Sequence, residues 1–185
     1  MSQAPDSPTA RVFFALWPNE AEGGALAAWQ EPLRHACGGR AMRRETLHMT
    51  LVFLGEVERT RLPSLRAAAQ VDQVPGFELC FDTVHLWKHN HIVYAAPDHV
   101  PPHLPQLVTA LEQALDEHGF KFDRRGYKPH ITLLRNIRPP QDELPQVQPA
   151  RWRIMDFALM QSVPQGGVMG YRVLDRFPLL AVDGT

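Results

Sequence analysis

The chain has 185 residues, of which 44% are hydrophobic and 21% charged, and its formal net charge at neutral pH is −1. This composition is typical of a globular protein with a buried core, and the near-zero charge excludes a protein that coats long nucleic acid through a broad basic face. A site for one or two phosphates is still compatible with it.

Three local features narrow the class of protein further. The longest apolar run, Val12–Trp17, is far shorter than the roughly 20 residues of a membrane-spanning helix, so we expect no membrane partner. Cys37 and Cys80 lie far apart and form no Cys-x-x-Cys pair, which argues against a disulfide framework or thiolate zinc site and fits a cytoplasmic setting. The polar stretch Met1–Ala10 predicts a flexible N-terminus, followed by a single domain over residues 11–185.

The first part of the chain predicts a strand, a helix and a second strand in that order. Arg11–Pro18 is an aromatic and β-branched run closed by proline, as in a buried strand. Apolar residues then recur with helical spacing over residues 25–33, and Gly38 stands where a helix would end. A second strand is predicted at Thr46–Gly55 (TLHMTLVFLG) and a further helix at Leu62–Val71.

The same order of signals recurs later in the chain. A strand is predicted at His91–Pro97, a helix over residues 104–115 that ends before Gly119, and a strand at Lys128–Ile137 (KPHITLLRNI). Such a repeat predicts two halves that pair about a pseudo-two-fold axis, because each half alone has too little apolar area to bury. Equivalent strands are then expected to face each other.

The remaining segments are expected to complete these halves. Phe77–Trp87 predicts one strand that enters the second copy, and the proline-rich segment Pro139–Pro149 predicts an exposed linker. Trp152–Ser162 and Tyr171–Leu180 predict two strands that are joined by a turn at Pro164–Gly167 and close the sheet.

Each copy carries a His-x-Thr motif in its second strand, at His48-Met49-Thr50 and at His130-Ile131-Thr132. Because side chains alternate along a strand, the His and Thr of each motif project together on one face. Two histidines across a cleft suit the cleavage of a cyclic phosphodiester without a metal, since one imidazole takes a proton from water and the other protonates the leaving ribose oxygen. The threonine hydroxyls can donate to the non-bridging phosphate oxygens.

Arg135 follows His130 by five residues. In a regular strand this odd offset places its side chain on the core face, whereas a bend near Asn136 would bring the guanidinium to the cleft, where it suits a bidentate phosphate contact. The spacing leaves both positions open.

A basic rim around the cleft is a further expectation. Basic residues precede both motif strands at matching places and would guide an RNA end, or would simply form a solvated charge run: Arg43, Arg44, Arg124, Arg125 and Lys128. Tyr127 is expected on the same rim. Together with Trp17 and Phe53 it is a candidate for stacking a base, although the expected place of Trp17 and Phe53 is the core.

Three segments resemble the signature segments of the two-histidine (2H) phosphoesterase superfamily, namely Phe13–Pro18, Leu47–Gly55 and Pro129–Arg135. More narrowly, the chain is similar to the bacterial and archaeal RNA 2′,3′-cyclic phosphodiesterases, also called 2′-5′ RNA ligases. This similarity runs from about Arg11 to Leu180 and includes Ser162 and Tyr171.

The resemblance implies an α+β fold of two pseudo-symmetric lobes, each with an antiparallel sheet and helices, whose His-x-Thr motifs line a central groove. The lobes would comprise roughly residues 11–75 with the closing C-terminal strands, and residues 76–140. It also implies hydrolysis of 2′,3′-cyclic phosphates at RNA or nucleotide ends to 2′-phosphates, with reversible 2′-5′ joining of tRNA halves in some members. By this likeness His48 is the proton donor and His130 the proton acceptor, Thr50, Thr132 and Arg135 bind the phosphate, and no metal or other cofactor takes part.

Other interpretations stay open at this point. A zinc site at His85, His89 and His91 has no standard ligand spacing, and a polar turn between two strands explains these residues better. A catalytically lapsed RNA-end binding module would bind without turnover. An enzyme for a cyclic phosphate on an ADP-ribose-type nucleotide would carry the same motifs. Nothing in the sequence calls for more than a monomer, which is the expected state.

Overall fold

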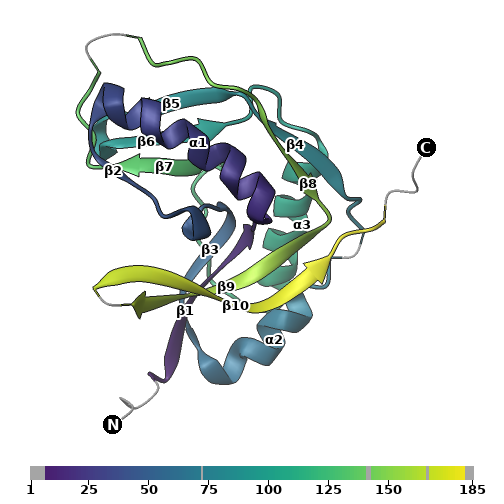
Figure 1. Ribbon diagram of the computed structural model, residues 1–185. Helices are drawn as coiled ribbons and strands as arrows, with labels where there is room; N and C mark the ends of the chain where they lie inside the picture. Colours follow the sequence, from purple (N-terminus) through teal and green to yellow (C-terminus); the bar gives the residue numbers. More distant parts are fainter. Residues whose placement is uncertain (1–6, 72, 141–142, 166, 182–185) are drawn as a thin grey trace.

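Two four-stranded antiparallel sheets form the framework of the protein, whose computed structural model describes residues 7–71, 73–140, 143–165 and 167–181 (Figure 1). The first sheet has the order β10-β9-β1-β3, with β1 at Thr9–Leu16, β3 at Met49–Glu58, β9 at Asp156–Gln165 and β10 at Val168–Pro178. The second has the order β2-β7-β6-β5, with β2 at Arg40–Ala41, β5 at Thr83–Trp87, β6 at Ile92–Ala96 and β7 at Ile131–Arg135. A two-stranded sheet pairs β4 at Phe77–Phe81 with β8 at Ala150–Ile154.

Within the described ranges, three α-helices cover these sheets: α1 at Glu20–Cys37, α2 at Leu62–Ala68 and α3 at His103–Glu117. Short 3₁₀ turns lie at Arg44–Thr46, Arg59–Arg61 and Lys88–Asn90. Helix α1 begins at a capping box, in which Asn19 and Glu22 each bond the other's backbone N–H, and it ends at Gly38, whose φ of 65° favours glycine. Among the described residues, no helix is long and apolar enough to span a bilayer. The α+β class and the antiparallel sheets agree with the sequence prediction.

The two long helices are exchanged between the repeats. Helix α1, from the first repeat, lies across the second sheet, where the Gln30 side-chain amide donates to the Leu133 carbonyl oxygen at 3.0 Å (Figure 1). Helix α3, from the second repeat, packs against helix α2 and against β3, which is a strand of the first sheet. The sequence predicts one lobe from residues 11–75 with the closing C-terminal strands and another from residues 76–140. In the structure each lobe takes its sheet mainly from one repeat and its long helix from the other.

Two segments that the sequence predicts as single strands are each divided between two sheets. Phe77–Trp87 breaks at Asp82, whose backbone N–H donates to Ala96 O and whose carboxylate accepts from the Asp98 N–H. The strand before this break joins the two-stranded sheet and the strand after it joins the second sheet. Trp152–Ser162 breaks in the same way at Met155, between β8 and β9. The alternation of apolar residues shifts by one position at each break, since Phe81 is followed by Val84 and Ile154 by Phe157, and the prediction of one continuous strand missed this shift.

The boundaries of other segments also differ from the prediction. Strand β1 begins at Thr9, and Ala10 is buried, so the predicted flexible stretch does not extend to residue 10. Helix α2 ends at Ala68, before the predicted end at Val71. The described residues of Pro139–Pro149 form neither helix nor strand.

Bulges at matching places interrupt both strands that follow the histidines. In β3, Val52 pairs with Phe14 and Thr50 with Ala15, so Leu51 is an extra residue. In β7, Leu134 pairs with Val93 and Thr132 with Tyr94, so Leu133 is the extra residue. A bulge shifts the alternation by one position. The residue three places after each threonine, Phe53 or Arg135, therefore shares the threonine's face.

Buried Gln30 holds the bulge in β7, because its side-chain amide donates both to Leu133 O and to Met42 O at 2.8 Å. We expect Gln30→Leu to lower the free energy of unfolding by about 1–3 kcal/mol, since it removes two hydrogen bonds and leaves Met42 O without this donor. Chemical denaturation measures the change. Gln106→Leu, at an exposed position of α3, is the matched control, and an equal effect of both variants would contradict the role of Gln30.

Candidate active site

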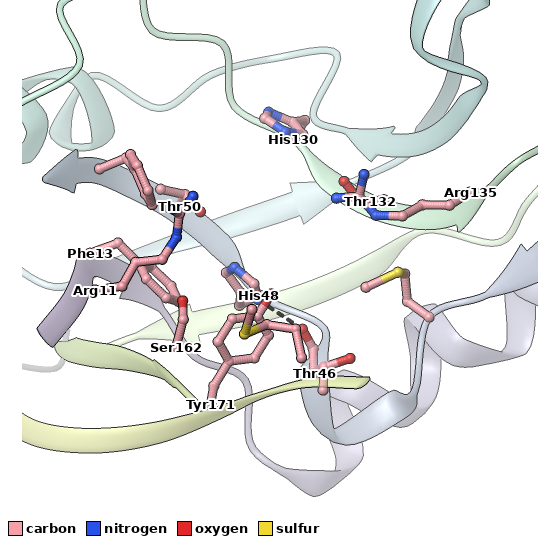
Figure 2. A pocket seen from close by; sticks show the side chains of 13 residues that line it. Arg11, Phe13, Thr46, His48, Thr50, His130, Thr132, Arg135, Ser162 and Tyr171 are labelled. Atoms are coloured by element: carbon pink, nitrogen blue, oxygen red, sulfur yellow. Dashed lines mark hydrogen bonds between the residues drawn. The ribbon is translucent and has the colours of Figure 1, made fainter. Parts of the chain in front are cut away.

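A cavity of about 270 Å³ lies between the two sheets and brings both His-x-Thr motifs together (Figure 2). His48 and Thr50 line it from the first sheet, and His130 and Thr132 line it from the second. Each histidine directly precedes its strand, and the residues inside the motifs, Met49 and Ile131, are buried. The remaining lining residues are Arg11, Phe13, Met42, Thr46, Phe53, Arg135, Ser162, Met169 and Tyr171.

His48 is enclosed by aromatic rings. Trp17 stacks on the imidazole at 5.2 Å between ring centroids, and Phe13 and Tyr171 lie at 5.1 and 5.0 Å. Its Nδ1 is 2.7 Å from the carbonyl oxygen of Thr46. Because a carbonyl only accepts, Nδ1 carries the hydrogen and Nε2 is the nitrogen left for the cavity. Burial lowers the pKa of His48 to about 4, so its imidazole is neutral at pH 7 in the free protein.

His130 has a matching arrangement on the opposite side of the cavity. Its Nδ1 donates to the carbonyl oxygen of Lys128 at 2.8 Å, again two residues earlier in the chain. Trp87 and Tyr94 lie edge-on to its ring at 4.6 and 5.7 Å. Burial lowers the pKa of His130 below its ordinary value, and the charge of Arg135 adds to this effect. His48 and His130 thus both carry the hydrogen on Nδ1, and both imidazoles line the same cavity.

Arg135 lines the same cavity, next to Thr132 in Figure 2. This position resolves the alternatives that the sequence spacing left open. The cause is the bulge at Leu133, which lies before the bend expected at Asn136. The bulge shifts the alternation of the strand by one residue, so Arg135 shares a face with Thr132 although its offset from His130 is odd. Close contact with Gly39 fixes the backbone here, because a Cβ at Gly39 would lie 2.6 Å from Arg135 O.

Three of the predicted rim residues line a second groove, of about 630 Å³, that adjoins the cavity: Arg125, Tyr127 and Lys128. The Tyr127 hydroxyl donates to the sulfur of buried Met49 at 3.3 Å, so it points into the core. Burial also raises the pKa of the Tyr127 hydroxyl. Tyr127 can therefore offer the groove only part of its ring.

The other predicted rim residues do not line the cavity. Arg44 donates to the carbonyl oxygen of Glu20 at the start of α1 and borders a separate hollow. Arg43 donates to Met169 O at 3.3 Å and lies 3.5 Å from a Glu45 carboxylate oxygen. Arg124 pairs with Asp116 on α3. The basic rim is thus limited to Arg125 and Lys128, because Arg43, Arg44 and Arg124 line neither the cavity nor the second groove.

Several site residues were not predicted as such from the sequence. Arg11 lines both the cavity and the second groove, and its only signal was a charge at the start of an apolar strand. The sequence predicts Trp17 and Phe53 as core residues and also offers both for stacking a base; in the structure Trp17 stacks on His48 and Phe53 lines the cavity. Tyr171 and Ser162 entered the prediction only through the resemblance.

The histidine cluster near β5 does not form a metal site. His85 Nε2 lies 3.1 Å from the Thr83 hydroxyl, and His91 Nδ1 lies 3.2 Å from Ile137 O. Across the ranges that the structure describes, no group of three or more His, Cys, Asp or Glu side chains is placed to hold a metal ion. The expected turn is present, because a 3₁₀ turn at Lys88–Asn90 joins β5 to β6.

Comparison with known proteins places this arrangement in a family. The family model described as 2′-5′ RNA ligase superfamily matches residues 22–165. The chain belongs to the 2′-5′ RNA ligase superfamily. This result confirms the resemblance drawn from the sequence.

Individual proteins also match nearly the whole chain. A protein of Escherichia coli named RNA 2′,3′-cyclic phosphodiesterase is 28% identical over 91% of this chain and 96% of its own. A protein of Thermus thermophilus with the same name is 27% identical over 94% and 92%. The crystal structure of E. coli LigT complexed with 3′-AMP superposes with a TM-score of 0.82 at 28% identity, covering 92% of this chain and 98% of the other.

Proposed function

We propose that this protein is an RNA 2′,3′-cyclic phosphodiesterase, which hydrolyses the cyclic phosphodiester at an RNA or nucleotide end to a 2′-phosphate. The observation that carries the proposal is the placement of His48 and His130 on opposite sides of one cavity, each with Nδ1 bound to a backbone carbonyl. The names of the two proteins that match more than nine-tenths of the chain support the same activity. The bound 3′-AMP in the E. coli structure supports a nucleotide as the ligand.

In the proposed reaction, water attacks phosphorus and the bond from phosphorus to the ribose 3′-oxygen breaks. His130 Nε2 takes the proton of the attacking water, and His48 Nε2–H gives a proton to the departing 3′-oxygen, which is the order that the family resemblance implies. The product is a 2′-phosphate with a free 3′-hydroxyl. Because His48 is neutral in the free protein, its donor role requires the anionic substrate to raise its pKa on binding.

Thr50, Thr132 and Arg135 are proposed to bind the non-bridging oxygens of the phosphate. Two hydroxyls and one guanidinium offer donors where negative charge grows in the transition state. The described residues that line the cavity include no carboxylate, which suits an anionic substrate. We propose that the reaction needs no metal, because the two imidazoles supply both proton transfers.

The test is turnover of a 2′,3′-cyclic mononucleotide in excess chelator. We expect undiminished conversion to the 2′-phosphate, with the phosphate position assigned by ³¹P NMR. Formation of the 3′-phosphate would contradict the proposed bond cleavage. Loss of turnover with chelator, restored by added divalent metal, would contradict the metal-free mechanism. Binding without turnover would favour the lapsed module.

The pH dependence of kcat/KM should be bell-shaped, with its maximum on the acid side of 6.5. The rate falls toward about pH 4, where both imidazoles become protonated, and falls again above the lowered pKa of His130, where both are neutral; this bell shape requires one proton on the pair and does not depend on which imidazole carries it in the free protein. Initial rates between pH 3.5 and 9 at substrate concentrations well below KM measure the profile. A maximum above pH 7, or a flat profile, would contradict this prediction.

A further inference from the structure

The second groove adjoins the catalytic cavity along a shared border. Arg11, Thr50, Phe53 and His130 line both, so the two spaces form one continuous surface. The groove has about 630 Å³ against about 270 Å³ for the cavity, which is more space than a cyclic phosphate alone needs. Its further walls come from the segment Asp123–Lys128 and from Trp87 at the end of β5.

Arg11 lies at this border and supplies a positive charge that the internal repeat does not predict. The bulges make Phe53 the equivalent of Arg135, so the first repeat has an aromatic ring where the second has a guanidinium. Arg11 on the neighbouring strand places its guanidinium carbon 4.8 Å from the Phe53 ring centroid. In Figure 2 this guanidinium lies beside Thr50, across the cavity from Arg135.

Nothing in the described part of the chain neutralises Arg11. Glu56 is its partner in strand register, but the Glu56 carboxylate accepts from the Thr9 hydroxyl at 2.7 Å, and no carboxylate within the described ranges forms an ion pair with Arg11. Its side chain is exposed and rests on an aromatic ring. An exposed guanidinium held in this way is available for a phosphate.

The chemistry of the substrate indicates which anionic group the Arg11 guanidinium binds. In an RNA with a 2′,3′-cyclic phosphate, the chain leaves the terminal nucleoside through its 5′-oxygen, so the next anion is the phosphodiester that joins it to the penultimate nucleotide. We propose that the second groove binds the penultimate nucleotide, with Arg11 on that phosphodiester. The inference rests on the proposed function and locates the site for the nucleotide that precedes the cyclic end.

The other residues of the groove suit a nucleotide. Lys128 adds a positive charge, while the carboxylate of Asp123 is held by Arg125 through its guanidinium and its backbone N–H. Glu112 is the second carboxylate in the lining and limits the net positive charge. The Trp87 ring offers a surface on which a base can stack without readout of its identity.

The test compares a cyclic mononucleotide with a dinucleotide that carries the same 2′,3′-cyclic phosphate. For the wild type we expect kcat/KM to be about tenfold higher or more for the dinucleotide, as one stacked base and one phosphate contact provide. Arg11→Gln should reduce this preference by about tenfold, Lys128→Gln should reduce it less, and Arg11→Lys should restore part of it. Arg34→Gln, on the exposed face of α1, removes the same charge elsewhere and should leave the preference unchanged.

The salt dependence of kcat/KM is a second test, which does not depend on differences in folding between the variants. A plot of log kcat/KM against log salt should be steeper for the dinucleotide by about 0.7 in the wild type, and Arg11→Gln should remove the difference. Equal kcat/KM for the two substrates in the wild type would overturn the inference, and so would an equal loss on both in Arg11→Gln, which would place Arg11 on the reacting phosphate. Failure of the proposed function itself is distinct, because then neither substrate turns over.

Discussion

Replacing either His48 or His130 by alanine is expected to lower kcat/KM for a 2′,3′-cyclic nucleotide at least about 100-fold, because each variant loses one of the two proton transfers. A 100-fold loss corresponds to about 2.7 kcal/mol of transition-state stabilisation. The bell-shaped pH profile should also lose the limb that belongs to the missing imidazole. Steady-state rates on the purified variants measure both effects.

The control for these variants is His118→Ala. His118 also bonds a backbone carbonyl through Nδ1, at 2.8 Å from Ala114 O, but it lies at the end of α3 and lines neither the cavity nor the second groove. Thermal unfolding of all three variants separates loss of chemistry from loss of fold. Activity within a few-fold of wild type in either catalytic variant would end the assignment.

A substrate with an activated leaving group separates the roles of the two histidines. A p-nitrophenyl phosphodiester expels a weakly basic phenolate, which needs little protonation, so the variant without the acid should recover most of its rate. The variant without the base should stay slow. Recovery of His48→Ala supports the proposed order, and recovery of His130→Ala would reverse the two roles.

Arg135→Lys is expected to lower kcat/KM by about 100-fold, although the charge is kept. Removal of a single preorganised donor to a developing oxyanion costs about 10²- to 10³-fold, and an ammonium group cannot reproduce the paired N–H groups of guanidinium on a phosphate. The shorter reach matters too, because the bulge at Leu133 fixes where the Arg135 backbone lies. The loss should appear in kcat as well as in KM.

Arg138→Lys is the matched control for Arg135. Arg138 is exposed and lies three residues further on, where it borders a separate hollow next to the C-terminal end of α1. It should keep full activity. An Arg135→Lys variant as active as this control would place Arg135 outside the phosphate site.

Local signals in the sequence were sufficient for the elements that repeat. Gly38 and Gly119 both adopt positive φ after a helix, as their places in the two copies predicted. The alternation around His48 and His130 predicted which motif residues point away from the core, because it depends only on strand geometry. The fold class and family followed from the same repeated motifs.

Features that depend on pairing between distant strands could not be predicted. The extra residues Leu51 and Leu133 are apolar like their neighbours, so no pattern distinguishes a bulge from a regular strand. The position of Arg135 follows from one of these bulges. The exchange of α1 and α3 was equally hidden, since an amphipathic helix indicates that it covers a sheet but not which one.

The exchange of the two long helices has a consequence for the integrity of the molecule. The sheet that holds His130 buries its apolar face under a helix from the N-terminal part of the chain, and the sheet that holds His48 depends in turn on a helix from the later part. Neither repeat is therefore a self-sufficient folding unit, and melting of one uncovers the hydrophobic surface of the other. The relative placement of the His48 and His130 imidazoles therefore persists until the shared core unfolds as a whole.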